Sequence, residues 1–208
     1  MNIAFIRNAL QQPLPGLEAQ LKMAPSYREN LDRNSILARK PRLGGVLLLL
    51  LETENDVEIV FTRRMEYAGV HSGQISFPGG KVEEQDSDFT ATALRETEEE
   101  IGVGRSHLQV LGTLSELYIP PSNFLVYPTV AAAKTALNFK KQDREVKEIF
   151  SIPLSYFFLE ESKGTTPVHL NKETVMDVPA YVQNDRVIWG ATAIILSEFL
   201  ALLHRASR

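Results

Sequence analysis

Residues 95–102 read RETEEEIG, a run in which glutamates fall close together along the chain. In a helix that repeats about every 3.6 residues, three of them share one face: Glu96, Glu99 and Glu100. Glu98 points away from that face by about half a turn. Carboxylates at this spacing repel one another unless a cation lies among them. The run therefore predicts a helix with one acidic face that requires a positive partner.

The predicted helix begins near Asp86 or Ser87 and ends before Gly102. Beside its acidic face runs a less polar stripe formed by Thr90, Leu94, Thr97 and Ile101. These residues are three or four apart, so their side chains lie one above another on the helix surface. We therefore expect the helix to be anchored on one side and to carry chemistry on the other.

A divalent metal ion is the natural counter-charge for such a face. Carboxylate oxygens suit Mg²⁺, Mn²⁺ or Ca²⁺, whereas the lack of any cysteine or local histidine argues against a zinc site. Just before the helix, Phe77, Pro78, Gly79 and Gly80 form a turn in which glycine lets the backbone approach a ligand. A carbonyl of this turn can join the metal, and we take Gly80 as the donor.

Gly80 and residues 95–103, RETEEEIGV, resemble the signature of the Nudix hydrolase family, G-x5-E-x7-R-E-U-x-E-E-x-G-U with U apolar. Two positions depart from this pattern. The acidic residue after the glycine is Asp86, which lies one residue further from Arg95 than usual, and Thr97 replaces an aliphatic residue. The longer spacing resembles the branch of the family that cleaves coenzyme A.

An upstream signature of the same branch, L-L-T-x-R-[SA]-x3-R-x3-G-x3-F-P-G-G, is also similar to this chain. The sequence runs from Val60 through Arg64 to Gly73 and then to the Phe77 turn in the same register. Met65 stands where serine or alanine is expected, and Gly69 stands where arginine is expected. The missing arginine bears on the substrate and not on the chemistry.

The resemblance implies an α/β protein with the Nudix α/β/α sandwich, a mixed curved sheet between helices. We assign residues 41–208 to this Nudix domain and residues 1–40 to an N-terminal extension. The extension has prolines at positions 13, 15 and 25, with apolar residues at helical spacing between them. It predicts one short amphipathic helix that serves as a lid or a dimer element.

The resemblance also implies roles for the acidic face, with Mg²⁺ or Mn²⁺ as the cofactor. Glu99 and Glu100 would bind the metal with Gly80, while Glu96 would be either a ligand or the general base. Arg95 would orient this face by ion pairing. In Nudix enzymes a later loop often brings another glutamate to the metal, for which Glu145 is the first candidate and Glu148 the second.

The strand that precedes the signature turn ends in Arg63 and Arg64, whose planar guanidinium groups suit phosphate binding. Surface ion pairing is the alternative. The expected substrate contacts are Arg63, Arg64, Gln74, Phe77, Pro78 and Gly79. His71, in the loop before Gly73, either touches the substrate or is a solvent-exposed histidine without a task.

The expected reaction is metal-dependent hydrolysis of the pyrophosphate bond of coenzyme A or its derivatives to 4'-phosphopantetheine and adenosine 3',5'-bisphosphate. One alternative is a Nudix hydrolase of another nucleoside diphosphate derivative, such as ADP-ribose, NADH or a nucleotide. Another is a ligand-binding module that keeps the fold without catalysis. The complete set of three glutamates argues against this last alternative.

Elsewhere the chain predicts strands at 45–51 and 57–62, joined by a turn, and at 108–114 and 124–132. A proline-rich loop over 118–123 either shapes a pocket or is a rigid connection. A hairpin of strands 174–182 and 186–189 precedes a final helix. The apolar stripe of that helix, Ile195, Phe199, Leu202 and Leu203, is expected in the core.

A formal net charge of −4 argues against a general nucleic-acid binder. The longest aliphatic run, 46–51, is far shorter than the roughly 20 residues of a membrane-spanning helix. The apolar patch at 3–6 lacks the length of a signal peptide. We therefore expect a cytoplasmic protein with a small-molecule substrate, no nucleic-acid or membrane partner, and homodimerisation as an open alternative.

Overall fold

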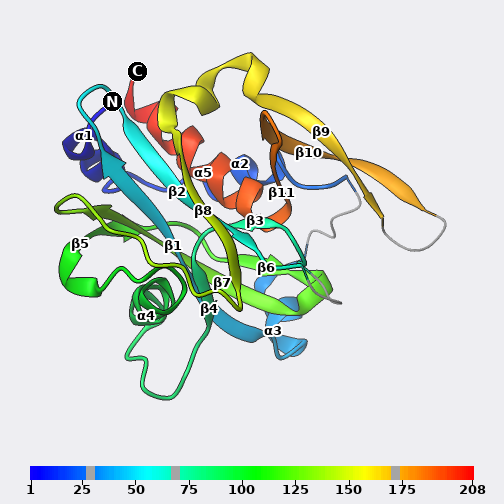
Figure 1. The fold of residues 1–208 in the computed structure, drawn as a ribbon. Helices are drawn as coiled ribbons and strands as arrows, with labels where there is room; N and C mark the ends of the chain where they lie inside the picture. The colour runs from blue at the N-terminus through cyan, green and yellow to red at the C-terminus, as the bar shows by residue number, and fades with distance from the viewer. Residues whose placement is uncertain (27–30, 67–70, 170–173) are drawn as a thin grey trace.

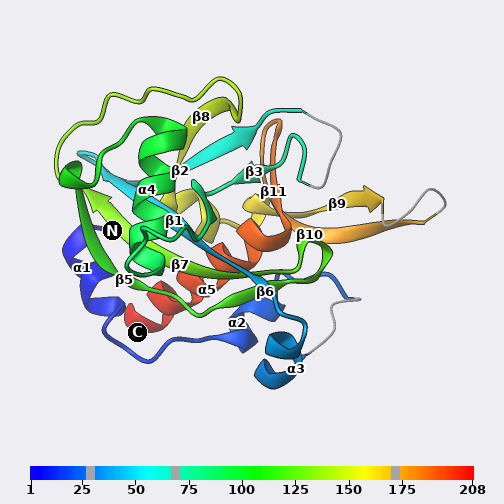
Figure 2. The same cartoon turned by 90° about the horizontal axis from the view of Figure 1, so that it is seen from below.

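The computed structural model describes residues 1–26, 31–66, 71–169 and 174–208. A mixed sheet lies between helix α4 on one face and helix α5 on the other (Figures 1 and 2), so the fold is the expected α/β class. The strands of the main sheet are β1 (Arg42–Glu52), β2 (Val57–Arg64), β3 (Ile75–Ser76), β4 (Gly79–Lys81), β5 (Leu108–Thr113), β6 (Leu117–Ile119), β7 (Phe124–Ala133) and β8 (Val146–Pro153). The longer helices are α4 (Phe89–Ile101) and α5 (Gly190–Ala206).

Strand β1 is the centre of the packing, and the residues in its middle are fully buried on both faces. Leu47 and Leu49 join the core beneath α4, whereas Leu48 and Leu50 join the core beneath α5. This division follows from the alternation of side chains along a strand. The continuous aliphatic run of the sequence is thus explained by helices that cover both faces of the sheet.

The connections of β1 bring distant segments of the chain to one edge of α4. Strand β1 pairs in parallel with β7 and antiparallel with β2 and β4, which makes the sheet mixed. In the pairing with β4, Gly45 lies opposite Gly80 and Val46 lies opposite Gly79. The glycine turn is therefore fixed to the sheet directly beside the acidic helix, and Figure 1 shows β4 next to α4.

A second, antiparallel sheet consists of β9 (Lys163–His169), β10 (Val175–Gln183) and β11 (Arg186–Trp189). Strands β10 and β11 confirm the predicted hairpin, which leads directly into α5. The apolar stripe of α5 is buried in the core, as predicted. Strands β8 and β9 were not predicted, because their sequences mix charged and apolar residues without a clear alternation.

The N-terminal extension differs from the expectation of a single helix. Its described part contains three short helices, α1 (Ile3–Ala9), α2 (Leu17–Leu21) and α3 (Arg33–Ala38). Helices α1 and α2 pack against α5, where the buried carboxylate of Glu198 accepts hydrogen bonds from Gly16 N (3.2 Å) and Gln20 Nε2 (2.9 Å). A role of this segment as a lid or dimer element stays a prediction.

The predicted proline-rich loop at 118–123 contains the end of β6 and one turn of 3₁₀-helix, Pro120–Ser122. The strands predicted around it are confirmed within one residue at each end. Gly69, at the position of the expected arginine, lies outside the described residues. None of the described helices is both long enough and apolar enough to cross a membrane.

Candidate active site

Helix α4 carries the acidic face, and specific caps fix both of its ends. The helix begins at Phe89, later than predicted, because the side chain of Asp88 caps it by accepting a hydrogen bond from Ala91 N (2.7 Å). It ends at Ile101 as predicted, since Gly102 adopts a left-handed conformation with φ of 73°. Asp86 is therefore left in the preceding loop, free to turn back toward the helix surface.

The inner side of α4 is buried as predicted. Leu94, Thr97 and Ile101 pack against the sheet. Thr97, which replaces the usual aliphatic residue, satisfies its hydroxyl within the helix by donating to Ala93 O (2.7 Å). The polar substitution therefore leaves no unpaired group in the core.

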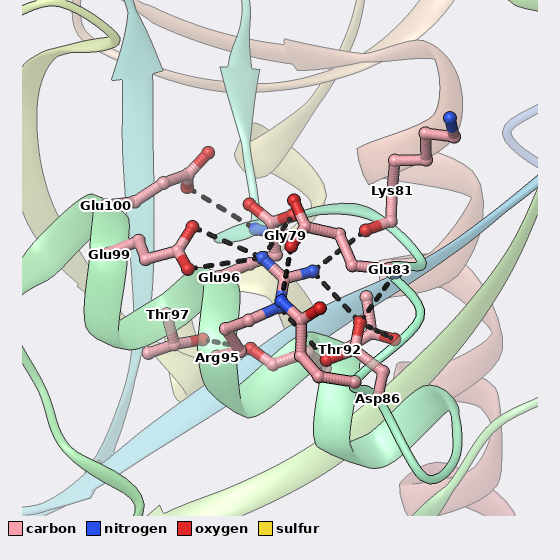
Figure 3. A network of polar contacts seen from close by, with 12 residues as sticks. Gly79, Lys81, Glu83, Asp86, Thr92, Arg95, Glu96, Thr97, Glu99 and Glu100 are labelled. Atoms are coloured by element: carbon pink, nitrogen blue, oxygen red, sulfur yellow. Dashed lines mark hydrogen bonds and ion pairs between the residues drawn. The ribbon is translucent and has the colours of Figure 1, made fainter.

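Arg95 lies at the centre of the acidic face (Figure 3). Its Nε and Nη2 donate to Asp86 Oδ1 and Oδ2 at 3.0 Å each, and Nη2 also donates to Lys81 O at 2.9 Å. Its Nη1 pairs with Glu96 (3.1 Å) and Glu99 (3.2 Å). These contacts raise the pKa of Arg95, and its hydrogen bonds lower the pKa of Asp86 to about 2.

Glu100 is the most deeply buried member of the face, with 4% of its side chain exposed. Gly79 N donates to its Oε2 (3.4 Å), and Arg64 Nη1 lies 3.9 Å from its Oε1. Burial raises the pKa of Glu100 to about 8, against the opposing effect of Arg64. The site therefore holds a carboxyl group whose charged form a nearby cation would stabilise.

Glu96 lies between the helix and the glycine turn. Burial raises its pKa, Arg95 opposes this, and the negative charges of Glu99 and Glu145 add to it. A Cβ atom on Gly80 would lie 2.4 Å from Glu96 Oε1, closer than atoms can approach. A side chain at position 80 would therefore displace the Glu96 carboxylate, whereas glycine lets the backbone rest directly against it.

The site residues fit a divalent cation by their chemistry. They offer carboxylate and carbonyl oxygens, the donors that Mg²⁺ and Mn²⁺ prefer, and burial raises the pKa values of Glu96 and Glu100, so a bound cation would favour their charged forms. Across the described ranges, no three acidic or histidine side chains already form a ready coordination cage. Instead, Glu96 and Glu99 turn toward Arg95, and Glu100 turns toward Gly79 N (Figure 3).

The two neighbouring arginines of β2 have different surroundings. Arg63 forms ion pairs with Glu148 and Asp185 at 3.2 Å each. For this residue the structure therefore favours surface ion pairing over phosphate binding. Arg64 instead lines a cleft beside the acidic face, and its buried Nε has no hydrogen-bond partner among the described residues. Of the two, Arg64 is the better placed to bind phosphate.

The cleft has a volume of about 470 Å³ and includes most of the predicted substrate contacts. Arg64, Gln74, Phe77, Gly79 and Gly80 line it. The prediction of Pro78 as a substrate contact is wrong, since Pro78 does not line the cleft; its carbonyl accepts a hydrogen bond from Leu47 N of β1 (2.8 Å).

His71 also lines the cleft and is held there in an unusual conformation. Its φ is 72°, a left-handed value that is uncommon for histidine, and its Nδ1 lies 2.9 Å from Gln74 Oε1. This placement favours a ligand-binding role for His71 over a solvent-exposed histidine with no function. The ligand-binding role stays a prediction.

The structure also distinguishes the two glutamates that were candidates for a further metal ligand, Glu145 and Glu148. Glu145 is exposed, and its charge acts on both Glu96 and Glu100. Glu148 accepts ion pairs from Arg63 and Arg186. Glu145 therefore remains the better candidate for a further metal ligand.

Further cleft residues come from segments far apart in the sequence. Arg42, Ser122 and Trp189 line the cleft from three different elements, and only their packing brings them together. Ser122 belongs to the proline-rich loop over 118–123, so its position supports the pocket-shaping alternative for that loop. Thr92, on the first turn of α4, was missed by sequence reasoning, and it donates to Asp86 Oδ2 at 2.9 Å.

The NUDIX domain family matches residues 41–178 of the chain. The human mitochondrial coenzyme A diphosphatase NUDT8 is 31% identical over 170 residues, which cover 80% of this chain and 72% of the human protein. The uncharacterized Nudix hydrolase NudL of Yersinia enterocolitica is 34% identical over 197 residues, which cover 91% of this chain and 86% of that protein.

Two solved structures share the fold. The Nudix hydrolase RenU from M. smegmatis has a TM-score of 0.53 and 13% identity, covering 80% of this chain and 86% of that one. A MutT/nudix family protein from Enterococcus faecalis has a TM-score of 0.53 and 15% identity, covering 98% of this chain and 75% of that one. At these identities the likeness concerns the fold alone.

Proposed function

The chain belongs to the Nudix family of hydrolases, and from this premise we propose that it hydrolyses the diphosphate bond of coenzyme A or a coenzyme A derivative. The products are 4'-phosphopantetheine, or its acylated form, and adenosine 3',5'-bisphosphate. The observation that carries this proposal is the cleft, in which Arg64 and the residues around Phe77 lie directly beside the acidic face of α4.

Two further observations support the same substrate. Asp86 and Arg95 have the longer spacing that resembles the branch of the family acting on coenzyme A, and their side chains are joined by two hydrogen bonds. The human relative carries the name coenzyme A diphosphatase. The cleft walls also contain Phe77, Phe124 and Trp189, which suit the apolar and planar parts of such a molecule.

The residues of the chain have distinct tasks in this reaction. Arg64 binds the diphosphate at the mouth of the acidic face, where its Nε has no hydrogen-bond partner in the described part of the chain. Glu99, Glu100 and the carbonyl of Gly80 would hold the divalent ion, for which we propose Mg²⁺ or Mn²⁺, and Glu96 would be either a further ligand or the general base. Such an ion, when bound, neutralises charge on the diphosphate and lowers the pKa of water. Arg95 orients Glu96 and Glu99 through its ion pairs.

Glu96 is the preferred general base of the chain. Burial and neighbouring charges raise its pKa, which brings a carboxylate closer to the range suited to accepting a proton from water. Its alternative role is that of a pure metal ligand. A Glu96→Gln variant that keeps metal affinity but loses turnover would support the role as base.

A second candidate reaction is hydrolysis of another nucleoside diphosphate derivative, such as ADP-ribose or NADH. It is favoured by Gly69 and Met65, which replace residues of the coenzyme A signature. Restoring arginine at position 69 separates the two. A gain in coenzyme A turnover supports the first reaction, whereas no gain leaves the second the stronger.

The proposed function is tested by turnover of a substrate panel with Mg²⁺ and with Mn²⁺. The panel contains coenzyme A, acetyl-coenzyme A, ADP-ribose, NADH and a nucleoside triphosphate. We expect a coenzyme A compound to have the highest kcat/KM. Preferential cleavage of any other member would contradict the proposal while leaving the Nudix chemistry intact.

A further inference from the structure

We propose that Arg42 is a specificity-determining residue that binds a phosphate monoester of the substrate, remote from the diphosphate that is cleaved. This inference rests on the proposed function and deepens it. In coenzyme A the corresponding group is the 3'-phosphate of the ribose, which ADP-ribose and NADH lack. Arg42 would thus distinguish coenzyme A compounds from other nucleoside diphosphate derivatives.

The charge of the cleft points to a ligand with more than one anionic group. The chain as a whole is acidic, with a formal net charge of −4. Among the described residues that line the cleft, none is aspartate or glutamate, and two are arginines, Arg42 and Arg64. A cleft of this composition in an acidic protein favours a polyanionic ligand over a neutral one.

Buried polar atoms without hydrogen-bond partners lie at or next to the same two arginines. Within the described part of the chain, two buried side-chain atoms have no hydrogen-bond partner, Arg64 Nε and Ser122 Oγ, and both residues line the cleft. Ser122 contacts Arg42, because Arg42 Nη2 donates to Ser122 O at 2.8 Å. Buried polar atoms are normally paired in proteins, so both atoms mark places in the cleft wall where the described residues leave a hydrogen bond unmade.

Arg42 is held in position before any ligand arrives. Its guanidinium lies 4.3 Å from the centre of the Phe124 ring, and one hydrogen bond to Ser122 O fixes its orientation. Across the described residues it has no carboxylate partner, in contrast to Arg63 and Arg95. A guanidinium with free donors and a fixed plane suits bidentate binding of phosphate oxygens.

The register of the sheet gives the distance between Arg42 and the acidic face. Arg42 and Val46 lie on the same face of β1, four residues apart, and Val46 pairs with Gly79 beside the acidic face. At about 3.3 Å per residue, the backbone of Arg42 is about 13 Å from this point. Arg42 and Arg64 line the same cleft, so a nucleoside with phosphates at two positions can contact both.

The test compares coenzyme A with dephospho-coenzyme A, which differs only by the 3'-phosphate. For the wild-type protein we expect a kcat/KM about 10- to 100-fold higher for coenzyme A, as one charge-assisted contact predicts, mainly through KM. In Arg42→Met this ratio should fall close to one, and Arg42→Lys should retain part of it. Arg105→Met removes an exposed arginine that does not line the cleft, and should keep the wild-type ratio.

An unchanged ratio in Arg42→Met, or a wild-type protein that does not discriminate, would overturn the inference while coenzyme A hydrolysis stands. If the wild-type protein hydrolyses neither compound, the result would instead count against the proposed function. Calorimetric binding then tests Arg42 independently. Adenosine 3',5'-bisphosphate should bind the wild-type protein more tightly than adenosine 5'-monophosphate, and equal affinities would refute the role of Arg42.

Discussion

Arg95 holds Asp86 through two parallel hydrogen bonds, Nε to Oδ1 and Nη2 to Oδ2, each 3.0 Å long. Side chains of an α-helix lean toward its N-terminus, so Arg95 reaches back over the first turns of α4 to the loop that contains Asp86. Asp86 also accepts from Thr92 Oγ1 and from Glu83 N, at 2.9 Å each. This pair anchors the arginine that in turn orients Glu96 and Glu99.

Replacing Asp86 by asparagine should destabilise the protein by about 2 kcal/mol at pH 7, because charge-assisted hydrogen bonds are lost. The pKa of Asp86 is lowered from 3.8 to about 2, so its stabilising effect is complete above pH 3.8. That effect is lost as the pH falls toward 2. Urea unfolding at pH 7, 4 and 2.5 should show the variant and the wild type converging at the lowest pH.

Asp177→Asn is the matched control, since Asp177 is exposed on β10 and has no ion pair with another described residue. It should unfold like the wild type at every pH. If Asp86→Asn and the wild type have the same free energy of unfolding at pH 7, the pair with Arg95 does not stabilise the fold.

Replacing Gly80 by alanine should reduce turnover strongly. The new Cβ would meet both carboxylate oxygens and the carboxyl carbon of Glu96, at 2.4 to 2.6 Å, so this side chain has to move. We expect kcat to fall by on the order of 100-fold with little change in the circular dichroism spectrum. Gly104→Ala, at a φ of −66°, meets the flexible end of Glu98 and should keep full activity. Equal activities of the two variants would mean that the position of Glu96 is not critical.

Glu100 should make the metal-free protein less stable as the pH rises. Its pKa is raised from 4.5 to about 8, so over this range the folded state binds more protons than the unfolded state. Thermal unfolding in the presence of a chelator should therefore show a Tm that falls between pH 5 and pH 8. Glu100→Gln should flatten this dependence.

Addition of Mg²⁺ should raise the Tm of the wild type more at pH 8 than at pH 5, because protons compete with the metal for Glu100. The Glu100→Gln variant should lose this difference. A metal effect that is the same at both pH values would indicate that Glu100 does not bind the ion.

Local features of the fold were predictable from the sequence. The acidic face of α4, its end at Gly102 and the buried stripe of α5 follow from helical periodicity over short distances. The start of α4 was placed too early, because Asp86, Ser87 and Asp88 are all acceptable caps by residue type. Only the structure shows that Asp88 caps the helix and that Asp86 binds Arg95.

Features that depend on distant segments were not predictable. Arg63 and Arg64 are adjacent in sequence, and their separate surroundings arise from strand β8 and the β10–β11 turn, which supply Glu148 and Asp185. Arg42 and Ser122 meet because β1 and β7 pair in parallel across about 80 residues of chain. Local periodicity carries no information about such pairing.

The most direct test of the account is the hydrolysis of coenzyme A with Mg²⁺ or Mn²⁺ by three proteins, the wild type, Glu99→Gln and Glu98→Gln. Glu99 lies on the acidic face and pairs with Arg95, whereas Glu98 points away from it toward Gly104. Chromatography of the products should show 4'-phosphopantetheine and adenosine 3',5'-bisphosphate from the wild type and from Glu98→Gln. Glu99→Gln should fold normally and lose on the order of 100-fold or more in rate. Equal rates for the two variants, or no metal-dependent cleavage by the wild type, would contradict the assignment of this face as the catalytic centre.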